Sequence, residues 1–254
     1  MYRIRAVDER ARTAELFRAV PRWRAFIESA LERDIGILSV DDVASPGVAV
    51  LFYGGLVVYA GDHTSPASEA AIRLHDVQPL VLAWDPEWTR LFRRVRAGRF
   101  AETTRYHGRS EALDPARLRD AMAAHRDSVQ PITARTLPGI EKELHWEHHK
   151  YHFNDRDHFL ADGHGYCLVV DELVASAASS YAISTRYSEC QVTTAAAHRR
   201  KGYARAVTAR YLHDCREHDV LTPWDASNEE SARLALSIGY RSVEEYTVFE
   251  QVDL

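Results

Sequence analysis

The chain has 254 residues, of which 46% are hydrophobic, so it is long enough to bury one large core or two ordinary ones. This composition excludes a disordered or fibrous protein, and a net charge of −5 argues against a general nucleic-acid-binding protein, which usually carries a basic excess. The charged N-terminal sequence lacks the apolar segment of a signal peptide, so we expect a cytoplasmic protein without membrane or nucleic-acid partners.

The first half of the chain predicts a mixture of helices and strands. Residues 8–34 carry helical patterning that Pro21 interrupts or restarts. Two apolar runs within residues 46–62 meet at Gly54-Gly55, a pattern that is typical of a β-hairpin. Three further elements are expected: a buried strand in residues 78–85, a helix in residues 86–98 and a strand in residues 99–109.

A domain boundary is predicted between residues 128 and 138, within the stretch 126–144, whose two prolines and one glycine separate patterned regions. We therefore expect an N-terminal α/β domain over residues 1–130 and a second domain over residues 131–254. The second domain alternates strands and helices, which predicts an α/β or α+β fold. Its expected elements are strands in 165–172, 173–184 and 188–194, a helix in 201–217, a strand in 221–226, a helix in 228–239 and a strand in 240–252.

The second domain contains a short cationic loop directly ahead of a predicted helix. Arg199, Arg200 and Lys201 precede Gly202, and no further glycine or proline follows for several turns. A helix N-terminus presents unpaired N–H groups and the positive end of the helix dipole, and glycine lets a ligand oxygen approach the backbone. Cations add attraction for a pyrophosphate or a ribose phosphate. The order of strand, cations, glycine and helix therefore favours a phosphorylated cofactor.

The alternative interpretations of this loop are a solvated basic segment or a targeting signal. The loop is not a P-loop, because the Gly-Lys-Ser/Thr ending is absent. It is not a dinucleotide-binding fingerprint either, because it has a single glycine.

Two ordered motifs resemble the GNAT acetyltransferase superfamily. The cofactor loop of that superfamily reads Arg/Gln-x-x-Gly-x-Gly/Ala, and this chain has Arg199 to Ala204 in that pattern. A following segment, in which an Asn opens a helix that ends at Gly-Phe or Gly-Tyr, matches Asn228 and Gly239-Tyr240. Residues 159–250 further resemble the branch that includes zwittermicin-resistance acetyltransferases.

The resemblance implies acetyl-CoA as cofactor, an amine as acceptor, and a mixed, splayed central sheet flanked by helices. The implied cofactor contacts are a strand that pairs with the pantetheine arm, a loop that wraps the pyrophosphate, and an Asn near the pantetheine. The residues are Val192, Thr193 and Thr194 on the strand, Arg199, Arg200, Lys201, Gly202, Tyr203 and Ala204 in the loop, and Asn228.

Acyl transfer to an amine needs a base for the amine and a proton source for the leaving thiolate. The resemblance makes Glu189 the first candidate base, because GNAT enzymes often carry a carboxylate on the strand that leads into the cofactor loop; a surface or substrate-anchoring carboxylate is the alternative. Strict alternation places Glu189 with Tyr187, Gln191 and Thr193 on one face, toward a polar cavity, although a bulge would change that parity. Asp225 is the second candidate, and its alternative role is to cap the next helix, which Ser227 or Asn228 could also cap.

The chain departs from the family at the usual acid. Many GNAT enzymes carry a tyrosine seven residues after the Asn, and this chain has Ala235 there. Tyr240, Tyr203 or water could substitute, or the thiolate could leave unprotonated. A noncatalytic acyl-CoA-binding sensor or regulatory protein is therefore the alternative function.

Residues 145–158 are rich in histidine. His145 and His149, or His148 and His152, have the i, i+4 spacing of a shared metal site, but Trp146 stands where a metalloprotease motif has glutamate. With no cysteine cluster nearby, an exposed helix or a wall of the substrate site is favoured over a metal. The candidate substrate contacts are Trp146, His149, Tyr151 and Trp224.

The remaining features favour structural readings. Cys167, Cys190 and Cys215 are odd in number and widely spaced, so we expect buried thiols and neither a disulfide nor a zinc site. The tryptophans of the first half are expected in its core. We expect this half to be a cap or a degenerate copy of the GNAT fold that walls the acceptor site. The leading function is an acetyl-CoA-dependent N-acetyltransferase acting on a small amine, such as an antibiotic or amino metabolite, with a homodimer as candidate assembly.

Overall fold

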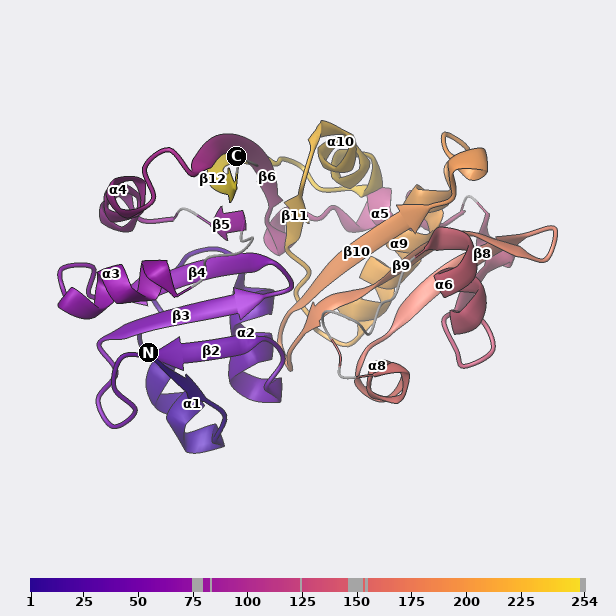
Figure 1. Cartoon of the computed structure of the whole chain (residues 1–254). Coiled ribbons are helices and arrows are strands. Elements are labelled where there is room, and N and C mark those ends of the chain that lie inside the picture. The colour runs from indigo at the N-terminus through magenta and orange to yellow at the C-terminus, as the bar shows by residue number, and fades with distance from the viewer. Residues whose placement is uncertain (75–79, 83, 124, 146–152, 154, 252–254) are drawn as a thin grey trace. The chain divides into compact units, whose positions relative to one another are not determined.

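The computed structural model describes the whole chain except residues 75–79, 83, 124, 146–152, 154 and 252–254 (Figure 1). The chain forms two compact units. Unit 1 contains Met1–Arg105 and Glu245–Leu254, and unit 2 contains Tyr106–Glu244. None of the described helices is both long enough and apolar enough to cross a membrane.

Unit 1 is built on strands that follow one another in the chain. Most of its sheet is antiparallel, with neighbours in the order β1, β2, β3, β4, and β5 then pairs in parallel with β4. The elements are β1 (Tyr2–Ile4), α1 (Val7–Thr13), α2 (Arg24–Arg33), β2 (Ile37–Val40), β3 (Val48–Tyr53), β4 (Leu56–Gly61), α3 (Pro66–Arg73), β5 (Leu80–Leu82), α4 (Pro86–Val95) and β6 (Phe100–Gly108), which enters unit 2 after Arg105.

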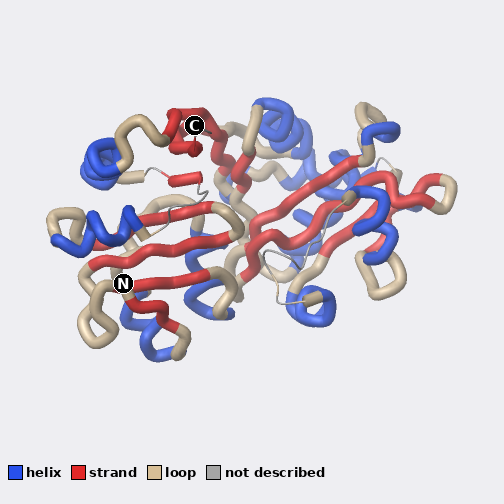
Figure 2. The backbone as a smooth tube through the Cα atoms, viewed as in Figure 1, coloured by secondary structure: helices blue, strands red, loops and turns tan. Residues whose placement is uncertain are grey.

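Unit 2 contains a four-stranded antiparallel sheet in the order β10, β9, β8, β7 (Figure 2). Helix α9 packs against this sheet, and α5 packs against α9. The elements are α5 (Pro115–Ala123), β7 (Val129–Pro131), α6 (Leu137–Leu144), α8 (Arg156–Asp162), β8 (Gly165–Val170), β9 (Leu173–Ile183), β10 (Ser188–Thr194), α9 (Tyr203–Glu217), β11 (Trp224–Ala226) and α10 (Glu229–Ile238), with β12 (Glu244–Gln251) returning to unit 1.

Several local predictions are confirmed. The hairpin turns at Gly54-Gly55, whose positive φ angles of 53° and 90° suit glycine, and Tyr53 pairs with Leu56 across it. Pro21 lies between α1 and α2. The three cysteines are buried and unbridged, and the mixed α/β fold class is as expected.

The order of described elements repeats. Two helices follow the first strand of each repeat, and three antiparallel strands, a helix, a strand, a helix and a last strand come after them. The first repeat runs from β1 to β6 and the second from β7 to β12. The sequence has no conspicuous short repeat that would indicate it, so the structural repeat is recognised from the order and pairing of the elements.

The last strands of the two repeats are exchanged. Strand β12 ends the second repeat but pairs with β5 in unit 1, through Val248 opposite Leu82. The end of β6 closes the first repeat but pairs with β11 in unit 2, where Trp224 lies opposite Gly108. The compact units therefore differ from the predicted domains 1–130 and 131–254.

Candidate functional site

The candidate site lies where β10 and the chain leading to β11 separate in unit 2. The two segments start in parallel, with Ser188 N–H donating to Leu221 O and Leu221 N–H donating to Arg186 O, both at 2.9 Å. Beyond this bridge, β10 and β11 belong to different sheets. The resulting splay is the sheet feature that the GNAT resemblance implied.

A carboxylate bridges the two strands of the splay. Glu189 is only 4% exposed, and its Oε1 accepts a hydrogen bond of 2.7 Å from the backbone N–H of Asp225 on β11. The register between β10 and β9 shifts next to Glu189, between Glu189 and Cys190. Cys190 lies in the core that includes α9, so the two neighbours occupy opposite faces as alternation predicted.

The outer edge of β10 is available for a ligand with amide groups. Strand β10 is the edge strand of its sheet. Ala195 N–H donates to Ala175 O at 2.9 Å, so the backbone groups of Ala195 and of every second residue before it point toward β9. Because backbone groups alternate between the two edges of a strand, Val192 and Thr194 direct their N–H and C=O groups away from β9. Thr193 turns its backbone toward β9, and its carbonyl also accepts the Ser176 hydroxyl at 3.0 Å.

The cationic loop follows this edge and leads into helix α9. Gly202 is the N-cap residue of α9 with φ of 82°, and among the described residues no side chain bonds the first N–H groups of the helix there. Arg199, Arg200 and Lys201 are all exposed beside it. An uncapped helix N-terminus with adjacent cations is an anion-binding arrangement.

His125 contacts this loop, although it lies more than seventy residues earlier in the chain. Its Nε2 is 3.1 Å from the carbonyl oxygen of Lys201. Its ring packs edge-on against the Tyr203 ring, with the ring centroids 4.9 Å apart. A planar trans peptide directs its C=O and N–H to opposite sides. Holding the Lys201 carbonyl on the His125 side therefore points the Gly202 N–H away from His125.

No local sequence pattern indicates a role for His125, because it is an isolated histidine between predicted elements. His107 was missed for a similar reason, since it lies inside a predicted strand. Strand β6 places His107 opposite Asp225 on β11, and His107 is 6% exposed. Directly opposite side chains on adjacent strands share one face of a sheet, so the His107 imidazole and the Asp225 carboxylate lie on the same face.

The structure also places the other catalytic candidates. Tyr240 is fully buried, its hydroxyl donates to Thr222 O at 2.5 Å, and burial holds the pKa of its phenol well above the usual value. Ala235 is fully buried in α10. Tyr203, the first residue of α9, is partly exposed.

Asn228 caps helix α10, since its Oδ1 accepts the backbone N–H of Ser231 at 2.9 Å. Asp225 lies in β11 and does not cap α10, so the capping role considered for it is wrong. Trp224 is 2% exposed, and its indole N–H donates to the Ser231 hydroxyl at 3.2 Å. Three candidate substrate contacts lie outside the described residues: Trp146, His149 and Tyr151. The same holds for His148 and His152, which were considered as a metal-binding pair.

Comparisons with known proteins cover most of the chain. A family model described as GNAT acetyltransferase matches residues 14–249. A GCN5-related N-acetyltransferase-like protein from Streptococcus suis 89/1591 has a similar structure, with a TM-score of 0.80 and 24% sequence identity over 96% of this chain and 99% of that chain. A GNAT-family acetyltransferase from Colwellia psychrerythraea gives a TM-score of 0.60 at 10% identity, over 99% of each chain. The uncharacterized N-acetyltransferase YdfB of Bacillus subtilis (strain 168) is 26% identical over 104 residues, which are 40% of each chain.

Proposed function

The chain belongs to the GNAT acetyltransferase family, and from this premise we propose that it transfers the acetyl group of acetyl-CoA to the amine of a small molecule. An antibiotic or another amino metabolite is the proposed acceptor, in line with the sequence resemblance to the zwittermicin-resistance branch. The proposal includes a cytoplasmic location and a homodimer as the assembly to test.

One observation carries the proposal: the outer edge of β10 runs directly into the uncapped, cationic N-terminus of α9. Val192 and Thr194 offer N–H and C=O groups that match the amides of a pantetheine arm. The α9 N-terminus at Gly202 then offers N–H groups and positive charge to a diphosphate. The proposed cofactor contacts are Val192, Thr193, Thr194, Arg199, Arg200, Lys201, Gly202, Tyr203, Ala204 and Asn228.

Acetyl-CoA would supply the acetyl group as a thioester, and the acceptor amine must lose a proton to attack it. We assign this proton to the Asp225 carboxylate ahead of Glu189, because Glu189 is almost fully buried and bonds the Asp225 backbone. Glu189 then acts as a positioning residue for Asp225. We assign acceptance of this proton from Asp225 to His107, because it lies opposite Asp225 in the strand register.

Protonation of the leaving thiolate is assigned to water or to Tyr203. Tyr240 is a weaker candidate, because its hydroxyl proton already bonds a backbone carbonyl inside the core. A thiol is acidic enough to leave as thiolate near neutral pH at modest cost, so the alanine at position 235 is compatible with turnover.

Titration calorimetry with acetyl-CoA, followed by thiol release with a panel of amines, tests the proposal. We expect wild type to bind, the Arg199→Ala/Gly202→Asp variant to fold without binding, and Asp225→Asn to bind without turnover. A well-folded wild type that does not bind acetyl-CoA would refute the proposal.

The second candidate function is a noncatalytic acyl-CoA sensor, which the buried Ala235 in place of a tyrosine favours. It predicts tight binding with no thiol release for any amine. Turnover that Asp225→Asn abolishes while acetyl-CoA still binds would eliminate it.

The residues proposed to contact the acceptor amine are Trp146, His149, Tyr151 and Trp224.

A further inference from the structure

The repeated fold gives every position of the splay in unit 2 an equivalent in unit 1. Leu80 N–H donates to Gly55 O at 2.9 Å between the parallel strands β5 and β4, just as Leu221 N–H donates to Arg186 O. Counting along both strands from this shared bond, Tyr59 corresponds to Cys190 and Gly61 to Val192. On the second strand, Trp84 corresponds to Asp225.

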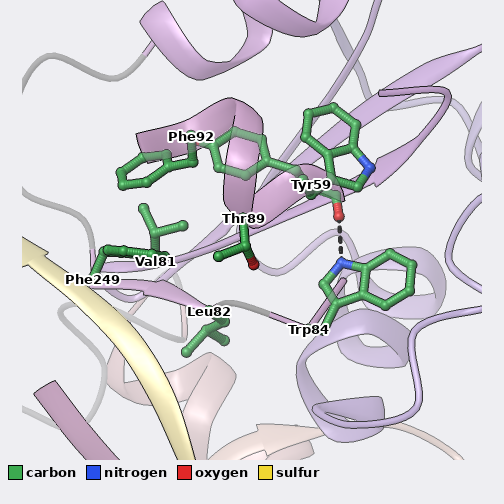
Figure 3. Close-up of a pocket in the computed structure, with 8 residues that line it drawn as sticks. Tyr59, Val81, Leu82, Trp84, Thr89, Phe92 and Phe249 are labelled. Atoms are coloured by element: carbon green, nitrogen blue, oxygen red, sulfur yellow. Dashed lines mark hydrogen bonds between the residues drawn. The ribbon is translucent and has the colours of Figure 1, made fainter. Parts of the chain in front are cut away.

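The equivalent edge of β4 is occupied by the protein itself. Asp62 N–H donates to Gly47 O at 2.9 Å, so alternation along β4 turns the carbonyls of Tyr59 and Gly61 toward β5. The indole of Trp84 donates to Tyr59 O at 2.8 Å (Figure 3), and the indole of Trp88 donates to Gly61 O at 3.2 Å. Gly61 is the counterpart of Val192, whose backbone groups β10 leaves for a ligand, and Tyr59 is the counterpart of Cys190, two residues earlier on the same edge.

Aromatic packing fills the space beside these bonds. Trp88 is 4% exposed and stacks on Tyr59, with ring centroids 5.5 Å apart and planes 14° apart. The ring centroids of Phe92 from α4 and Phe249 from β12 lie 4.8 Å apart. Both rings line a small pocket together with Tyr59, Trp84 and Trp88 (Figure 3). A pantetheine arm would have to displace tryptophans that are hydrogen-bonded and packed.

The loop after β4 also lacks the features of an anion site. Asp62 stands there, and hydrogen bonds from Thr64 hold the pKa of its carboxyl below the usual value, so it stays negative. Ser65 caps helix α3 through its side chain, and Pro66 removes a backbone donor from the first turn. This loop therefore presents a negative charge and a capped helix where unit 2 presents three cations and an uncapped one.

We propose that unit 1 contains a second, closed copy of the cofactor site, with the indoles of Trp84 and Trp88 in place of the pantetheine arm. The chain consequently binds one acetyl-CoA, in unit 2 alone. This inference rests on the proposed function, because it uses acetyl-CoA as the ligand of the open copy.

Calorimetric stoichiometry is the first test. We expect one acetyl-CoA per chain for wild type and none for Gly202→Asp, while Trp84→Phe, which keeps a ring but loses the indole N–H, still binds one. Two equivalents in wild type, or one equivalent left in Gly202→Asp, would overturn the closed site. No binding by wild type would instead refute the proposed function.

Hydrogen exchange of the indole N–H groups tests the closure without any cofactor. In ¹⁵N-tryptophan-labelled protein, with signals assigned from Trp84→Phe and Trp88→Phe, we expect both indole protons to exchange slowly and to keep their chemical shifts when acetyl-CoA is added. Exchange as fast as in an exposed indole would show that the β4 edge is open and would overturn the inference on its own.

Discussion

Replacing His125 tests whether the cofactor loop is held in place from outside the loop. The side chain makes one described hydrogen bond to the loop, 3.1 Å long, to the Lys201 carbonyl. One hydrogen bond contributes about 0.5–1.5 kcal/mol, and about 1.4 kcal/mol is a tenfold change in Kd. His125→Ala should therefore weaken acetyl-CoA binding by about 2- to 12-fold, with KM for acetyl-CoA rising in parallel and kcat changing little.

The assay is calorimetry at fixed pH, with thermal unfolding to confirm that each variant is folded. His125→Gln, whose amide can also donate to the carbonyl, should recover most of the affinity. His218→Ala is the matched control, since His218 bonds Asp214 O at the other end of α9. An unchanged Kd for His125→Ala, alongside lost binding in Gly202→Asp, would show that the loop keeps its conformation without this contact and would refute the reasoning.

Three further outcomes follow from the same contacts. Glu189→Ala removes the acceptor of the Asp225 N–H and should lower the free energy of unfolding by about 1–3 kcal/mol in urea titrations, whereas Glu189→Gln, which keeps an oxygen, should lose less. A Gly202→Ala substitution should lower the free energy of unfolding by about 1–2 kcal/mol through backbone strain, because φ is 82° at this position while an added Cβ would come no closer than 3.6 Å to His125. An unchanged free energy of unfolding in the same titrations would contradict the strain. Burial lowers the pKa of His164, so its neutral form is favoured in the folded state, and the stability it contributes should be full above pH 6.5 and fall as the pH drops below that value. Thermal unfolding at pH 5.5 and 7.5 in wild type and His164→Gln measures this, and an equal pH dependence in both would exclude His164 as the source.

The parts of the site that are local in sequence were predictable, because they depend on backbone chemistry over a few residues. The helix start at Gly202, the cations before it and the Asn228 position all follow from turn and helix-end preferences. Glu189 was placed on the correct face by alternation alone, yet its bond to Asp225 N–H was not predictable, since it depends on how two strands separate.

The parts that involve distant segments escaped prediction. Nothing near His125 indicates that it will meet a loop around Lys201, and nothing near His107 indicates a carboxylate neighbour on β11. The last strand of the chain was expected in the second domain, and it pairs with β5 instead. Both repeats end in a strand, so the pairing in the folded chain decides which partner each of the two strands takes.

The exchanged last strands make the two repeats dependent on one another during folding. A chain cut at residue 130 would leave β5 without β12, and the second fragment would lack the part of β6 that pairs with β11. Each fragment would then present an unpaired strand edge, which promotes aggregation. During synthesis, the second edge of β5 is paired only after Val248 emerges, because β4 pairs with the first edge alone. This region should therefore acquire full protection from hydrogen exchange late, and two co-expressed fragments should reassemble by exchanging these strands.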